Sequence, residues 1–177
     1  MSIIVEDGTG LATAESYCSV DYADTHHTAR QNTVWTGAVT LSKEAALRKA
    51  SDYMLQTYRL KWAGSRVKTT QALDWPRYDV PMTDTAGGYK GMQPVWSYVV
   101  VPDPVQRACA ELASRVLQGG GAILLPDLER VAKREKVDVL ETEYADGRTP
   151  HKTFPAIDRL LAPFFAQSGY VLGVVRA

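Results

Sequence analysis

The alternation of apolar and polar residues along the chain predicts a small helical bundle. Mostly apolar residues recur every three to four positions over residues 46–57 and again over residues 105–116, which is the spacing of side chains on one face of a helix. We expect Ser42 to act as the N-cap of the first of these helices, which should end near residues 58–62. Both apolar stripes are expected to face the core.

The boundaries of the helix over residues 105–116 are the best marked in the chain. Asp103 is placed to act as its N-cap, Pro104 stands at the first helical position, and glycines occupy positions 119–121 after its end. Cys109 lies beside the apolar stripe and is expected to widen it, because a buried free cysteine behaves as a small hydrophobic residue.

Two shorter helices are predicted nearer the ends of the chain. Ser19 can cap a helix that runs to about Arg30, and residues 31–40 are expected to follow as a connector. Residues 154–161 form a last helix, with Pro155 tolerated in its first turn. The inner face of the Ser19-capped helix is expected to hold Val20, Ala23 and His27.

A long aromatic segment over residues 61–101 separates the two periodic helices. It holds three of the four tryptophans and repeated proline and glycine residues, which favour turns over regular structure. Loops of this length are uncommon and usually either bind something or are disordered. Its aromatic content favours an ordered lid over the helices, ahead of a ligand-binding aromatic cage. The expected anchors, against the core or against a neighbouring subunit, are Trp62, Trp75, Pro76, Arg77 and Trp96.

Beyond the periodic helices, the pattern predicts two extended elements. Residues 131–150 show period-two alternation, which indicates a strand or an extended arm. Residues 169–177 form an apolar, β-prone tail that we expect to dock either within its own chain or on a partner. The predicted fold is therefore mainly α, a single helical domain over residues 1–168 followed by a docking tail. The candidate docking residues of this tail are Tyr170, Val171, Leu172, Val174, Val175 and Arg176.

The balance of charge argues against strong nucleic-acid binding. Lys plus Arg and Asp plus Glu are equal at 20 each, so the formal net charge is zero. The best basic cluster, over residues 133–136, is interrupted and flanked by acidic residues. A single-strand-binding alternative stays open, because such sites interleave aromatic platforms with basic groups. The aromatic segment supplies both kinds of group in Lys61, Trp62, Arg66, Lys68, Trp75 and Arg77.

No catalytic or metal-binding pattern stands out in the sequence. His26 and His27 are adjacent, so on a helix they point about 100 degrees apart, and we interpret them as a surface pair. Cys18 and Cys109 match no zinc spacing and are expected to be buried, reduced thiols. We therefore expect no enzymatic activity, no metal and no cofactor. No apolar run reaches the roughly 18 residues of a membrane span, so a membrane association is not expected.

A set of motifs spread over nearly the whole chain resembles a family of tailed-phage proteins. Members also show a proline-marked entry into the third helix, here residues 101–105. The motifs that carry the resemblance are residues 5–12 (VEDGTGLA), 16–20 (SYCSV), 23–24 (AD), Trp35, 43–47 (KEAAL), 71–77 (QALDWPR), 101–105 (VPDPV) and 131–137 (VAKREKV).

This resemblance implies a structural protein of the virion neck, a head-to-tail connector assembled in the host cytoplasm. Such a connector forms a homo-oligomeric ring, commonly twelvefold, beneath the portal protein and meets tail or stopper proteins on its other side. Double-stranded DNA would pass through the ring without specific binding. The resemblance carries over no catalytic residues. Members are also often labelled DnaT-like single-stranded-DNA-binding proteins, which gives the alternative function.

Overall fold

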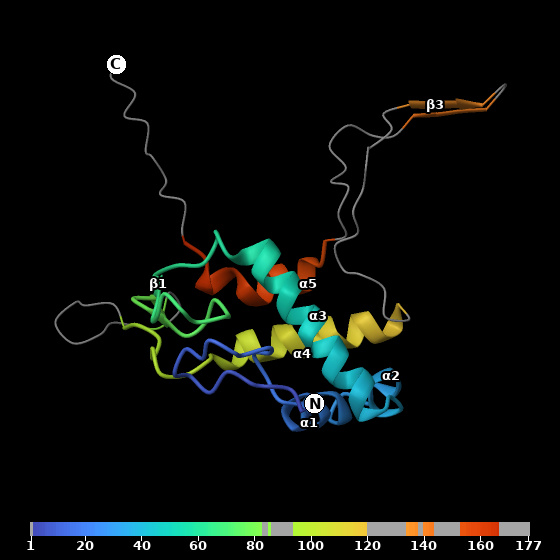
Figure 1. Cartoon of the computed structure of the whole chain (residues 1–177). Helices are drawn as coiled ribbons and strands as arrows, with labels where there is room; N and C mark the ends of the chain where they lie inside the picture. Colours follow the sequence, from blue (N-terminus) through green and yellow to red (C-terminus); the bar gives the residue numbers. More distant parts are fainter. Residues whose placement is uncertain are drawn as a thin grey trace, which may run out of the picture.

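Helices carry most of the regular structure in the described part of the chain (Figure 1). The computed structural model describes residues 2–82, 85, 94–119, 134–137, 140–143 and 153–166. The mainly α fold class is confirmed. The elements in chain order are α1 (Val20–Thr28), α2 (Thr33–Thr36), α3 (Thr40–Tyr58), β1 (Ser65–Arg66), β2 (Arg77–Tyr78), α4 (Asp103–Gln118), β3 (Arg134–Val137), β4 (Leu140–Glu143), α5 (Pro155–Leu161) and the 3-10 helix η2 (Ala162–Phe164).

The core lies between α3 and α4, which pack together more extensively than any other pair of described elements. Their predicted stripes meet there, since Leu47, Met54 and Leu112 are all completely buried. The first turns of α3 lie beside the last turn of α4, because Ser42 and Val116 line the same groove. The two helices therefore run in opposite directions. Helices α1, α2 and α5 add further contacts to α4.

The N-terminal helices begin at side-chain caps. Ser19 Oγ accepts a hydrogen bond of 3.0 Å from Tyr22 N at the start of α1, as predicted. The connector expected over residues 31–40 instead contains the one-turn helix α2, capped by Asn32. Its anchor is Trp35, which is fully buried and whose Nε1 donates to Asp24 Oδ1 at 2.6 Å. A single turn has no periodic stripe, so the pattern could not reveal it.

Two predicted caps are wrong in position. Helix α3 begins at Thr40, so Ser42 lies inside its first turn, and the N-cap residue Val39 makes no side-chain capping bond. Asp103 is the first helical residue of α4 and not its N-cap. Its carboxylate accepts a hydrogen bond of 2.5 Å from Tyr22 Oη and so joins α4 to α1. The Asp103 carboxylate thus takes part in a tertiary contact that the local pattern could not indicate.

The described part of the aromatic segment packs against the core as an ordered lid. Trp75 is completely buried and meets Trp62 and Phe164 edge to face, with ring centroids 5.8 and 5.5 Å apart. Strands β1 and β2 form a short antiparallel ladder within this segment. The Trp75–Pro76 peptide bond is cis.

The predicted arm contains a β-hairpin. Strands β3 and β4 pair in antiparallel register from Arg134↔Glu143 to Val137↔Leu140, which confirms the period-two interpretation. Each pairs with no other strand that the structure describes. The predicted tail over residues 169–177 lies outside the described residues. None of the described helices has the length and hydropathy that crossing a bilayer requires.

Candidate functional site

The predicted anchors of the aromatic segment converge on one inward-facing cluster. Trp62, Trp75 and Arg77 are 4%, 0% and 7% exposed, and Pro76 is buried. Trp96 is partly buried and lies against Phe164, with ring centroids 5.1 Å apart. Because their faces are covered by the protein itself, Trp62 and Trp75 serve as core residues and not as open platforms for a ligand.

Arg77 holds the base of the segment together through backbone carbonyls. Its guanidinium donates to the carbonyls of Ala63, Gly64 and Asp74 at 2.8, 2.7 and 3.2 Å. A planar guanidinium can satisfy three acceptors in fixed directions, which a lysine cannot do. Burial lowers the pKa of Arg77, and the nearby Asp74 carboxylate acts in the opposite direction.

The Asp74 carboxylate, which belongs to the same segment, is completely buried. Its Oδ2 accepts a hydrogen bond of 3.2 Å from Trp62 Nε1. Its Oδ1 lies 3.6 Å from Arg59 Nε and accepts no hydrogen bond from the described residues. Burial raises the pKa of Asp74 above its ordinary value, and the attraction of Arg59 only partly offsets that effect.

This raised pKa predicts a distinctive pH dependence for Asp74→Asn. A carboxyl whose folded pKa lies above its unfolded pKa stabilises the fold at low pH and loses that stabilisation as pH rises through the folded value. We therefore expect the free energy of unfolding of the variant to rise relative to wild type from about pH 4 upward. The difference should level off once Asp74 is fully ionised. Urea unfolding over a pH series measures it.

Glu15→Gln supplies the matched control with the opposite sign. A hydrogen bond from Arg48 lowers the pKa of Glu15, so this carboxylate stabilises the fold above its ordinary pKa and loses its effect as pH falls. A constant difference between Asp74→Asn and wild type across the pH series would contradict the raised pKa of Asp74.

The opposite side of the aromatic segment presents an exposed apolar surface. The side chains of Tyr78 and Tyr98 are 38% and 50% exposed, and their ring centroids lie 4.8 Å apart. We call this the aromatic surface, and its residues are Tyr78, Val95, Tyr98, Val99 and Val100. Exposed apolar residues that gather on a soluble protein often mark an interaction site, and the Tyr78–Tyr98 contact joins the two stretches of chain here. Sequence reasoning missed it, although the run Tyr98-Val99-Val100 was a usable signal.

Two local features hold the aromatic surface outward. Successive strand residues point to opposite faces, so Tyr78 faces away from the side on which Arg77 is buried. Gly8 packs against the strip formed by residues 94–101. It has a φ of 98°, and a Cβ at this position would overlap the Val99 carbonyl. Glycine is therefore required at position 8 for the N-terminal turn to fit against this strip.

Two arginines of the aromatic segment are bonded within the fold. Arg66 Nη1 donates to the Gln71 carbonyl at 3.2 Å. Arg77 is buried against backbone carbonyls. The basic residues of the segment thus fall into two groups, because Arg66 and Arg77 bond to backbone carbonyls whereas Lys61 and Lys68 are exposed.

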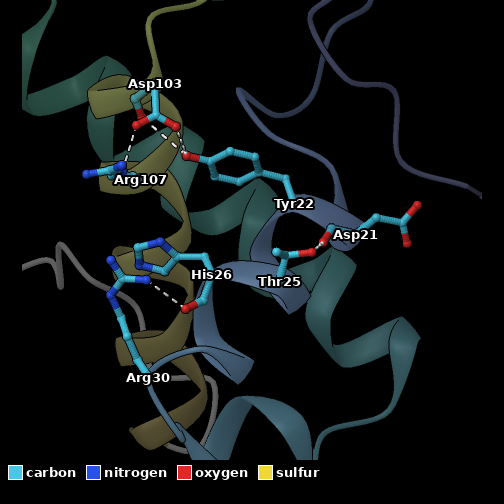
Figure 2. A pocket seen from close by; sticks show the side chains of 7 residues that line it. All are labelled: Asp21, Tyr22, Thr25, His26, Arg30, Asp103 and Arg107. Atoms are coloured by element: carbon cyan, nitrogen blue, oxygen red, sulfur yellow. Dashed lines mark hydrogen bonds and ion pairs between the residues drawn. The ribbon is translucent and has the colours of Figure 1, made fainter.

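A second polar region joins α1 to α4 (Figure 2). Tyr22 and Arg107 both bind the Asp103 carboxylate, the latter through Nε at 2.6 Å. Beside them lies a pocket of about 350 Å³. Arg107 pairs with Asp103 beside this pocket, and Arg30 Nη1 donates to the His26 carbonyl at 2.9 Å. The lining residues are Asp21, Tyr22, Thr25, His26, Arg30, Asp103 and Arg107.

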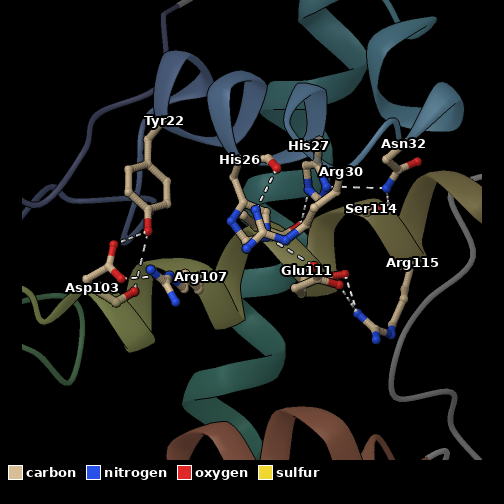
Figure 3. Close-up of polar contacts among 11 residues, drawn as sticks. Tyr22, His26, His27, Arg30, Asn32, Asp103, Arg107, Glu111, Ser114 and Arg115 are labelled. Carbon is tan, nitrogen blue, oxygen red and sulfur yellow. Dashed lines mark hydrogen bonds and ion pairs between the residues drawn. The ribbon is translucent and has the colours of Figure 1, made fainter.

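The two adjacent histidines are buried in this region, so the prediction of a surface pair is wrong (Figure 3). They are 9% and 1% exposed because α4 packs over them. His26 Nε2 lies 3.0 Å from Glu111 Oε1, and Arg115 donates to the other carboxylate oxygen at 2.9 Å. Burial alone would raise the pKa of Glu111, but these two hydrogen bonds outweigh it and lower the pKa.

The hydrogen bonds of His27 determine its tautomer. Asn32 Oδ1 accepts from Trp35 N, so Asn32 Nδ2 is the group that faces His27 Nδ1, at 3.3 Å. Nδ1 therefore accepts, and Nε2 carries the proton that it donates to the Ala110 carbonyl at 3.0 Å. Burial lowers the pKa of His27, which favours this neutral form.

His26, His27 and Glu111 also have the residue types of a metal site, with ligand atoms within 4.8 Å of one another. Both ring nitrogens of His27 are already used, so a metal at His27 would displace one of its hydrogen bonds, either that from Asn32 or that to the Ala110 carbonyl. We assign these side chains a structural role in joining α1 to α4.

The two cysteines are free and buried, as predicted. Cys109 Sγ lies 3.5 Å from Ser51 Oγ and 3.7 Å from Ser16 Oγ, so α4 contacts both α3 and the N-terminal segment at this point. Contact with the Cys109 thiol and burial both raise the pKa of Cys18 well above its ordinary value, which favours an unreactive thiol.

The described residues thus define a small α-helical protein with a closed aromatic core and one exposed aromatic surface. A family model described as "Putative DnaT-like ssDNA binding protein" matches residues 1–177, and the chain belongs to this family. Searches of curated proteins and of solved structures found no match.

Proposed function

We propose that this protein is a head-to-tail connector of a tailed phage, a subunit that acts by binding other proteins in the virion neck. The observation that carries the proposal is that the aromatic residues of this segment separate into buried and exposed ones. Its tryptophans Trp62 and Trp75 are buried, whereas the exposed Tyr78 and Tyr98 present an apolar surface suited to protein contacts. The motif resemblance described above supports the same function.

The zero net charge supports a connector whose lumen lets DNA pass. Tight non-specific binding requires Lys and Arg side chains that neutralise phosphates, and it would oppose movement of DNA through a channel. The proposal includes a homo-oligomeric ring, portal and tail or stopper proteins as its partners, and a portal contact through residues 170–176.

Single-stranded-DNA binding is the second candidate function, and the description of the matching family favours it. Sequence-independent sites of this kind stack bases on exposed aromatic rings beside a basic groove. Tyr78 and Tyr98 could provide rings and the exposed Lys61 and Lys68 positive charges, whereas Arg66 and Arg77 bond to backbone carbonyls. We place this function second because the formal net charge of the chain is zero.

Removing the gene from the phage that carries it tests the connector function. We expect DNA-filled heads and separate tails that fail to join, as seen by electron microscopy, because the neck would lack one of its layers. Supplying the wild-type chain in trans is the control and should restore complete particles. Normal joining of heads and tails without the protein would refute the proposal.

A salt-dependent titration distinguishes the two functions directly. Fluorescence anisotropy of a labelled oligonucleotide should show only weak binding of the purified protein. Tight binding that weakens steeply between 50 and 200 mM salt (about a thousandfold or more for a multi-phosphate contact) would favour the single-strand-binding function instead.

A further inference from the structure

The last described residues of the chain lie beside the aromatic surface. Ala166 N donates to the Lys61 carbonyl at 2.7 Å. Two residues earlier, Phe164 packs on Trp96, with ring centroids 5.1 Å apart. Trp96 stands in the same strip of chain as Tyr98, which belongs to the aromatic surface. The C-terminal tail, residues 169–177, therefore begins three residues beyond a point that is fixed next to this surface.

The C-terminal tail is long enough to cross the aromatic surface. Six residues lead from Ala166 to Leu172, and an extended chain covers about 3.3 Å per residue, or about 20 Å in all. Tyr98 is two residues from Trp96, which is about 7 Å along the strip. The Tyr78 ring lies 4.8 Å from that of Tyr98. Both tyrosines are thus within reach of the tail of the same molecule.

A second apolar hollow lies farther from the tail. It has a volume of about 340 Å³, and Val34, Ala38 and Ala45 are among its lining residues. The hollow is at the start of α3, since Ala45 belongs to the second turn of that helix. Ala166 is bonded to Lys61, three residues after α3 ends. A helix of 19 residues is about 28 Å long, so the aromatic surface is the nearer of the two regions.

We propose that the C-terminal tail packs across the aromatic surface of its own chain as an extended strand. Phe165, near the start of this stretch, already has extended backbone angles, with a φ of −84° and a ψ of 148°. Alternate residues of an extended segment share one face. One face of the tail would then hold Tyr170, Leu172, Val174 and Arg176. We assign this face to the contact, because Gly173 interrupts the apolar side chains of the other.

The chemistry of this face matches that of the aromatic surface. Its tyrosine, leucine and valine side chains would meet the exposed Tyr78, Val95 and Tyr98. Next to Tyr78, the exposed Asp79 forms no ion pair with a described residue. Arg176 is the one charged side chain of the tail and supplies the opposite charge. Exposed ion pairs contribute little energy, so the apolar contact carries the docking and the charges favour one direction of the strand.

Docking would cover two apolar elements of the free protein at once. Exposed apolar patches and unpaired β-prone ends promote aggregation, which this contact would reduce. In the connector function proposed above, the portal contact of residues 170–176 would require the C-terminal tail to leave the aromatic surface. The contact is a property of the isolated chain and does not rest on that function.

Hydrogen exchange of the full-length wild type is the first test. Mass spectrometry should show that residues 94–100 and residues 170–176 both exchange more slowly than an open chain. This protection should stay constant over about a 100-fold range of protein concentration, because a contact within one chain is unimolecular. Exchange of residues 170–176 at the rate of an unstructured peptide would overturn the proposal. Protection that grows with concentration would also overturn it, since the tail of another copy would then be the occupant.

Leu172→Asp and Val171→Asp are a matched pair of variants for the second test. Each adds one carboxylate to the C-terminal tail, but only Leu172 belongs to the face assigned to the contact. Leu172→Asp should speed the exchange of residues 94–100 about fivefold or more, whereas Val171→Asp should change it less than about twofold. Circular dichroism checks that both variants keep the helical core. Unchanged exchange in Leu172→Asp, or equal acceleration in both variants, would overturn the contact.

These measurements are independent of the connector function. If phage heads and tails fail to join without the protein while residues 170–176 exchange freely, the connector function stands and the contact is wrong. If heads and tails join normally without the protein while both variants behave as expected, the contact stands and the connector function is refuted.

Discussion

Replacing Trp75 with alanine is expected to lower the free energy of unfolding by about 3 to 5 kcal/mol, the cost of deleting a large aromatic side chain from a packed core. Trp75 is completely buried and meets Trp62 and Phe164 edge to face. Its removal would leave a cavity where the aromatic segment joins the C-terminal helices. Chemical denaturation followed by circular dichroism measures the change.

Two further variants sharpen this prediction. Trp75→Phe should cost less than Trp75→Ala, because Trp75 Nε1 has no hydrogen-bond partner among the described residues and nothing polar is lost with it. Tyr98→Ala is the exposed control and should change stability by only about 0.5 kcal/mol. Unchanged stability of Trp75→Ala combined with lost self-association would place Trp75 at an interface instead of in the core.

The second large effect is expected for Arg77→Leu, which should destabilise the protein by about 3 to 5 kcal/mol. The substitution removes the donor to three backbone carbonyls and one of the positive charges near the buried Asp74 carboxylate, which then keeps its ion pair with Arg59. Arg77→Lys should recover only part of the loss, because an ammonium group cannot reproduce the planar fork. Urea denaturation at neutral pH compares the variants.

Arg66→Leu is a matched control from the paired strand. Arg66 opposes Arg77 in the ladder but donates a single described hydrogen bond, so its loss should cost about 1 kcal/mol. In an Asp74→Asn background the cost of Arg77→Leu should fall, since the buried charge is gone. Equal costs in the two backgrounds would show that Arg77 acts through the carbonyls alone.

The helices could be predicted because their signals are local. The stripe over residues 105–116 faces the core as expected, and the glycine at position 119 ends α4. Caps were less predictable, since a polar side chain near a helix start can bond elsewhere. Asp103 binds Tyr22 from α1, a contact that no pattern within α4 could indicate.

The candidate site was predictable only in part. The sequence drew attention to Trp62, Trp75 and Arg77, because tryptophans and prolines in a long segment indicate ordered structure. It did not indicate which aromatic residues are exposed. Tyr78 is exposed beside the buried Arg77 only because the short β1–β2 ladder turns alternate residues to opposite sides.

The sequence by itself determined the helical class, the apolar face of each main helix and the absence of a net charge, since these depend on residue type and spacing. Only the tertiary structure decided that Trp75 is a core residue and that His26 is buried as well as His27. Those outcomes depend on Phe164 and on α4, which lie far away in the chain and reach these side chains only after folding. Burial is a property of the assembled elements, so the same tryptophan could have been a binding platform had nothing covered it.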